Sequence, residues 1–160
     1  GLFRVHDPAP SDAIVALLYE RVLDEESEEL LRVRERLVGV PLKSALREIL
    51  ANIIRVETRL FKLNKAFHLR YHCALHLGMW RGPYRTTGEF IEATWLPLLH
   101  LYEHEITTQH PALAAYLLGQ GLRSVIRSVL EDMPAQLEDP ALLDSLVAMA
   151  IGCLRPSALG

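Results

Sequence analysis

A helix predicted over residues 140–154 has no side suited to water, and this constrains the fold more than any other stretch. Asp139 is expected to cap it, and Pro140 stands where a first-turn proline is tolerated. One side is apolar and holds Leu142, Leu143, Leu146, Val147, Met149, Ile151 and Leu154. The other side carries the small residues Ala141, Ser145, Ala148 and Gly152, with Asp144 as its one charge. Such a helix should be buried on both sides, and in a chain of 160 residues another subunit is expected to supply the second covering surface.

A second long helix is predicted immediately before it, over residues 111–132. Apolar residues recur there at steps of three and four, and Met133-Pro134 ends the pattern. Two such helices from each of two identical chains would form a four-helix bundle, so the sequence predicts a homodimer. The predicted dimer interface consists of Leu118, Leu122, Val125, Leu142, Leu146, Met149 and Leu154.

The rest of the chain also follows helical periodicity, and no stretch alternates at period two. Further helices are expected from about residue 11 to residue 38, from Pro41 onward, through residues 58–79, and over 89–108 with a kink at Pro97. The helix from Pro41 either continues through residue 79 or breaks near Glu57-Thr58. We therefore expect an all-α fold of about six helices.

Composition narrows the class of protein. Half of the residues are hydrophobic and the formal net charge is −3, which excludes a disordered chain and gives no basic surface for nucleic acid. Cys73 and Cys153 lack metal-binding or disulfide-framework spacing. Without an apolar run of membrane-spanning length or a signal-peptide pattern, a soluble cytoplasmic protein with no membrane association is expected.

Both ends of the chain carry motifs that resemble the TetR family of bacterial transcription regulators. The opening Gly1-Leu2-Phe3-Arg4-Val5-His6 is similar to the end of that family's DNA-reading helix, and Ser11-Asp12-Ala13-Ile14 to the polar start of its fourth helix. The stretch from Asp139 to Leu154 is similar to the family's last helix. The link Asp7–Pro10 is longer than usual, Val5 and His6 replace an aromatic pair, and the first DNA-binding helices are absent.

The resemblance implies a division of the chain and a function. Residues 1–10 would be the remnant of a DNA-binding domain and its link, and residues 11–160 a ligand-binding and dimerisation domain. The family's members are homodimers through the last two helices, hold a small-molecule effector among the middle helices, and release DNA when it binds. DNA would be contacted only through the missing N-terminal helices, and no cofactor is implied.

Large aromatic residues on two of the middle helices are candidates for lining an effector cavity. The predicted ligand-binding set is Phe67, Tyr71, Trp95, Leu99, Tyr102 and Tyr116. Their clustering beside Pro97 favours an apolar cavity with a few orienting hydroxyls. The alternative is that they are ordinary core aromatics.

Histidines recur at four-residue steps on two predicted helices. Histidines four residues apart share a helix face and can bind one transition metal, so His72, His76, His100 and His104 are candidate ligands of a metal- or haem-binding protein. Their positions, with that of His68, fall on faces that also carry Lys62, Lys65 and Glu103, so solvated histidines are the favoured interpretation.

No catalytic motif is present, and an enzyme is not expected. Gly119 and Gly121 lie inside a predicted helix, where each weakens it by about 1 kcal/mol relative to alanine. They indicate either a close approach of another helix or a tolerated irregularity. The remaining alternative is a dimerisation module that binds no ligand.

Overall fold

The structure, a computed structural model, is all-helical in the part that it describes. That part comprises residues 13–14, 17–18, 21, 25, 32, 35–66, 68 and 87–156, with only the backbone given for 87, 88 and 90–94. It contains the α-helices α2 (Leu42–Leu63), α4 (Thr87–Leu101), α5 (Pro111–Asp132) and α6 (Pro140–Leu154), and the short 3-10 helix η1 (Pro134–Glu138). The all-α prediction is confirmed, whereas the described residues establish four α-helices rather than six. The expected remnant at residues 1–10 lies outside them.

The start of α2 follows from two residues with restricted backbones. Gly39 has a φ of +78°, a value that residues with a side chain rarely adopt, and so lets the chain turn. Pro41 is the N-cap of α2, which then runs unbroken through Glu57 and Thr58. The helix ends at Asn64, whose backbone is extended at φ −161° and ψ 101°. Of the two alternatives, the break near Glu57-Thr58 is excluded, and the continuous helix passes these residues but ends before residue 79.

Helix α4 is shorter than its apolar periodicity suggests. It passes Pro97 and ends at Leu101 instead of continuing to Thr108. Beyond it the chain turns, with hydrogen bonds from the Glu105 and Ile106 amides to the Tyr102 carbonyl. The turn buries Tyr102 and carries Glu105 to the start of α2, contacts that a continued helix would not make.

The bounds predicted for the last two helices are confirmed. Pro111 occupies the first turn of α5, where its missing amide hydrogen costs no hydrogen bond. Met133 ends α5, and Pro134 opens η1. The carboxylate of Asp139 caps α6 by accepting the amide of Ala141 at 2.8 Å.

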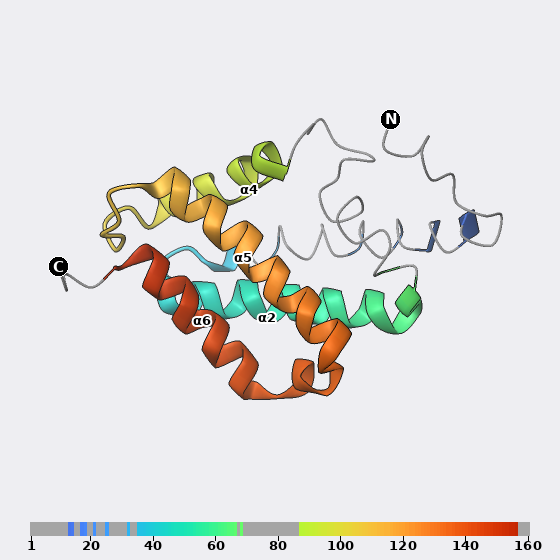
Figure 1. The fold of residues 1–160 in the computed structure, drawn as a ribbon. Coiled ribbons are helices and arrows are strands. Elements are labelled where there is room, and N and C mark those ends of the chain that lie inside the picture. The colour runs from blue at the N-terminus through green and yellow to red at the C-terminus, as the bar shows by residue number, and fades with distance from the viewer. Residues whose placement is uncertain are drawn as a thin grey trace.

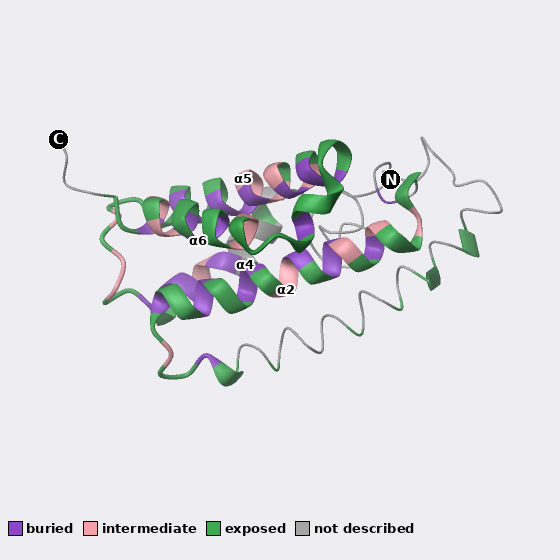
Figure 2. Cartoon of the chain, turned by 90° about the horizontal axis from the view of Figure 1, so that it is seen from below, coloured by how far each residue is buried: buried purple, intermediate pink, exposed green. Residues whose placement is uncertain are grey.

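The described helices pack around one apolar core. Helices α5 and α6 run in opposite directions beside each other, α2 packs against α6, and α4 packs against α5 (Figure 1). Buried residues lie on the sides of the helices that face one another (Figure 2). The core includes Leu46, Leu50, Ile126, Leu130, Leu146 and Leu154, each no more than 1 % exposed.

Candidate functional site

Several residues predicted for the dimer interface belong instead to the core of their own chain. Leu118, Leu122, Leu146 and Leu154 are at most 3 % exposed because they lie in the core that α2, α4, α5 and α6 share within the chain. Val125 and Leu142 are partly buried against that core. Only Met149, at 47 % exposed, lies on the outside. The leucine side of α6 therefore faces inward, a choice that its sequence leaves open.

The outer side of the α5–α6 pair mixes small and apolar residues with charged ones, among them the Arg127–Glu131 ion pair of α5. Uncharged residues exposed along it are Leu113, Tyr116, Leu117, Ser124 and Ser128 of α5, and Ala141, Ser145, Ala148, Met149 and Gly152 of α6 (Figure 2). We call this set the outer face. The exposed acids of α5, Glu131 and Asp132, lie in its last turn, and Asp144 of α6 pairs with Arg47 of α2 at 2.6 Å. Small and apolar residues are thus exposed on both helices. Those of α6, Ala148 and Gly152, border a groove that Lys43, Arg47 and Arg155 also line.

Two glycines on these helices are not closely packed against any other described part of the chain. A Cβ atom built on Gly121 or Gly152 would meet no atom within 4 Å. Close approach of another described helix therefore does not explain Gly121. Each glycine still weakens its helix by about 1 kcal/mol relative to alanine.

The aromatic set predicted for a cavity divides into three groups. Trp95, Leu99 and Tyr102 are at most 7 % exposed and lie in the contiguous core. Phe67 and Tyr71 lie outside the described residues. Tyr116 is 47 % exposed on α5, so it does not face the interior and its assignment to the cavity is wrong.

A buried carboxylate–histidine pair lies at the far end of α2. His68 Nε2 is 2.8 Å from Glu57 Oε2, and the side chains of His68 and Glu57 are 0 % and 3 % exposed. The solvated face predicted for His68 is therefore wrong. Glu57 was missed, although it interrupts the apolar stripe formed by Leu46, Leu50 and Leu60, and an acid inside such a stripe signals a buried polar contact.

The other histidines do not gather into a metal site among the described residues. His100 is exposed, His104 Nε2 lies 3.8 Å from Glu105 Oε2 with its side chain 71 % exposed, and His72 and His76 lie outside the described part. Within that part, no three His, Cys, Asp or Glu side chains are close enough together to hold one metal ion.

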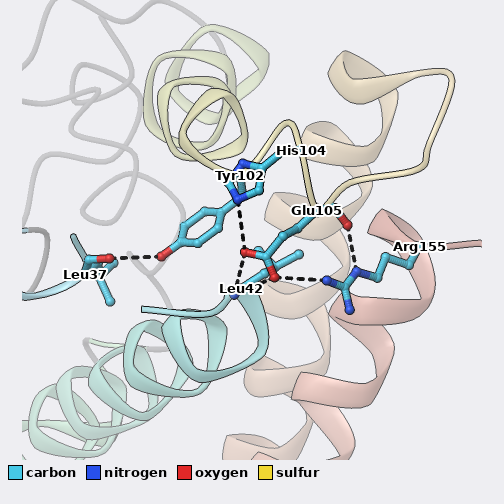
Figure 3. Close-up of polar contacts among 6 residues, drawn as sticks. All are labelled: Leu37, Leu42, Tyr102, His104, Glu105 and Arg155. Carbon is cyan, nitrogen blue, oxygen red and sulfur yellow. Dashed lines mark hydrogen bonds and ion pairs between the residues drawn. The ribbon is translucent and has the colours of Figure 1, made fainter. Parts of the chain in front are cut away.

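A polar cluster centred on Glu105 joins three helix ends (Figure 3). The Leu42 amide, at the start of α2, donates to both Glu105 carboxylate oxygens at 3.2 and 3.3 Å. Arg155, just after α6, donates from Nη2 to the carboxylate at 3.0 Å and from Nε to the Glu105 carbonyl at 2.7 Å. Pro41 has no capping side chain, so Glu105 replaces one and places negative charge at the positive end of α2.

Tyr102 is buried at the same end of the molecule. Its hydroxyl donates to the Leu37 carbonyl at 3.2 Å (Figure 3). Burial raises the pKa of Tyr102, and the charges of Glu105 and Glu48 raise it further. A shallow groove of about 560 Å³ opens beside it, lined by residues 37–41, Leu101, His104 and Glu105. The Glu105 carboxylate in this groove already accepts hydrogen bonds from Leu42 and Arg155. The cluster therefore has a structural role, in which it connects the ends of the helices.

Known proteins give no further guide to the site. No helix in the described part combines the length and apolar character needed to cross a bilayer. Comparison of the chain with protein-family models, curated proteins and solved structures finds no match.

Proposed function

We propose that the chain is the effector-sensing and dimerisation domain of a TetR-like transcriptional regulator, which binds a small, largely apolar molecule and forms a homodimer through α5 and α6. The observation that carries this proposal is the outer face. Its residues are small or apolar over two adjacent helices, as expected for a helix pair that packs against a copy of itself. The ends of the chain supply the resemblance to the family.

The two glycines support a partner rather than an open surface. Gly121 and Gly152 have open space around them in the single chain, and each weakens its helix by about 1 kcal/mol. A helix of a second chain could approach closely at both positions. Exposed Leu113, Leu117 and Met149 would then be removed from water.

The proposed sensor is the interior between α2, α4 and α5. Buried residues there are almost entirely aliphatic or aromatic, which suits a largely apolar effector. Glu57 and His68 form a buried polar pair at the far end of α2.

The outer face can be tested without disturbing the core. Ala148 is exposed on α6, so Ala148→Glu should leave the fold intact and place a carboxylate in the dimer interface. Ala51→Glu makes the same change on exposed α2 and is the matched control. Light scattering at micromolar concentration should give twice the 18.1 kDa chain mass for the unmutated protein and for Ala51→Glu, and a lower mass for Ala148→Glu. A mass of 18.1 kDa for the unmutated protein would contradict the proposal.

A dimerisation module without an effector is the second candidate. It is favoured by the burial of Trp95 and Leu99 and by the hydrogen bond that satisfies the Tyr102 hydroxyl within the chain. A thermal-shift screen of small apolar compounds separates the two functions. A compound that raises the unfolding temperature of the dimer in a saturable way supports the sensor, and a dimer that no compound stabilises supports the module.

A further inference from the structure

An open groove lies between α2 and α6, where the two helices pack side by side. Its volume of about 570 Å³ is within the range of sites that hold small organic molecules. The residues that line it are Lys43 and Arg47 of α2, Asp144, Val147, Ala148, Ile151 and Gly152 of α6, and Arg155 just after α6. The groove therefore combines cationic side chains with an apolar stretch of α6.

Helical spacing brings these residues into one groove. Lys43 and Arg47 are one turn apart, so both project from the same side of α2, and both are exposed. On α6, Ala148 and Gly152 are also one turn apart and exposed. A Cβ atom built on Gly152 would meet no atom within 4 Å, so there is room for a ligand beside it.

The cations of the groove outnumber their acidic partners. Arg47 Nη2 lies 2.6 Å from Asp144 Oδ1, and Arg155 Nη2 lies 3.0 Å from Glu105 Oε1. Lys43 has no carboxylate partner in the part of the chain that the structure describes. Among the described residues, the groove thus has one positive charge that no acid of the chain compensates.

This excess matches a ligand with a single negative charge. A lysine ammonium donates several hydrogen bonds, and a carboxylate accepts them in the strong, charge-assisted form. A second negative charge on the ligand would be repelled by Asp144 and Glu105, which lie next to the arginines. An aliphatic chain behind the head would cover the exposed part of Ile151 and remove its own surface from water.

We propose that the groove between α2 and α6 binds an aliphatic carboxylate, with its head at Lys43 and its chain along Ala148, Ile151 and Gly152. The site is separate from the interior proposed for the effector, so the inference does not rest on that function. Ala148 and Gly152 also belong to the outer face, which places the bound chain at the edge of the proposed dimer contact.

Three probes with the same chain and different heads test the assignment: octanoate, octyl phosphate and octanol. Calorimetric titration of the full 160-residue protein at neutral pH should show the tightest binding for octanoate. Lys43→Gln should weaken octanoate by about three- to fivefold, as expected for an exposed charge contact, and leave octanol unchanged. Lys43→Arg keeps the charge and should retain the affinity for octanoate.

Lys62→Gln is the matched control. It removes the same charge from an exposed position at the other end of α2, outside the groove, and should alter none of the affinities. Lys43 and Lys62 are both exposed, so neither substitution disturbs the core.

Three results would overturn the inference. Octanol that binds as tightly as octanoate, or octyl phosphate that binds more tightly, excludes a site for a carboxylate. A loss of octanoate affinity in Lys43→Gln no larger than in Lys62→Gln places the bound octanoate outside the groove. Absence of octanoate binding also overturns the inference, and it leaves the interior effector site to be judged by the thermal-shift screen of apolar compounds.

Discussion

The two sides of α6 are covered in different ways. On the inner side Leu146, Ala150 and Leu154 are fully buried by the chain itself, and the end of that side is fixed by Arg155 and Glu105. On the outer side Ala148, Met149 and Gly152 remain exposed although they carry no charge. The inner side is closed by large side chains and satisfied polar groups, whereas the outer side exposes small and apolar residues that the described part of the chain leaves uncovered. This difference locates the proposed dimer contact more narrowly than the sequence does.

The largest expected loss of stability comes from a substitution on the inner side of α6. Leu146→Ala should lower the free energy of unfolding by about 2–5 kcal/mol, because it leaves a cavity in a close-packed core. Met149→Ala lies on the outer side of the same helix. When the protein is too dilute to dimerise, it should lower the free energy of unfolding by less than Leu146→Ala does. Urea denaturation of both variants checks the contrast. A similar loss for the two would show that the inner and outer sides are not distinct.

The second-largest expected loss of stability comes from the polar cluster centred on Glu105. Glu105→Gln keeps the size of the side chain but weakens its bonds to the Leu42 amide and Arg155, and should cost about 1–3 kcal/mol. Glu103→Gln is the control, since Glu103 is exposed two residues away. Equal urea midpoints for the two variants would show that the cluster adds nothing to stability.

Tyr102 gives the same end of the molecule a dependence on pH. Because burial and nearby carboxylates raise its pKa above 10.0, the folded protein holds the phenol proton after the unfolded chain has lost it. The stabilisation is complete below about pH 10 and is lost as the pH rises through the folded-state pKa. Tyr102→Phe should flatten the fall in unfolding free energy above pH 10, while costing about 1 kcal/mol at neutral pH through the lost bond to Leu37. An unchanged alkaline slope in the variant would show that Tyr102 does not titrate on unfolding.

Local sequence signals predicted the helix bounds in the last third of the chain. They did not predict helix ends that depend on contacts between residues far apart in the sequence. The bounds of α5 and α6 followed from Pro111, Pro134, Asp139 and helical periodicity, which act over a few residues. The end of α4 did not follow from local signals, because it depends on the contact between Glu105 and Leu42, which are 63 residues apart.

The candidate site was predicted only in part for the same reason. Periodicity places residues on helix faces but does not say which face another helix covers. The prediction therefore includes Leu118, Leu122, Leu146 and Leu154 in the dimer interface, although they lie in the core of the single chain. The pairing of Glu57 with His68 spans the end of α2 at Asn64, an interruption that the apolar pattern does not show.

The smallest expected effect is that of Gly152→Ala. This substitution should stabilise the single protomer but weaken its association into a dimer. A Cβ atom there meets nothing within 4 Å in the single chain, so Gly152→Ala should stabilise an isolated protomer by up to about 1 kcal/mol through helix propensity. In a dimer with a second helix close to Gly152, the added methyl group should instead weaken association. Sedimentation equilibrium measures the dimer dissociation constant, and urea denaturation below that constant measures the protomer. A variant more stable as a protomer but weaker as a dimer places the partner helix at Gly152. A variant equally or more dimeric places the contact elsewhere on the outer face, because only a distant partner leaves room for the methyl group.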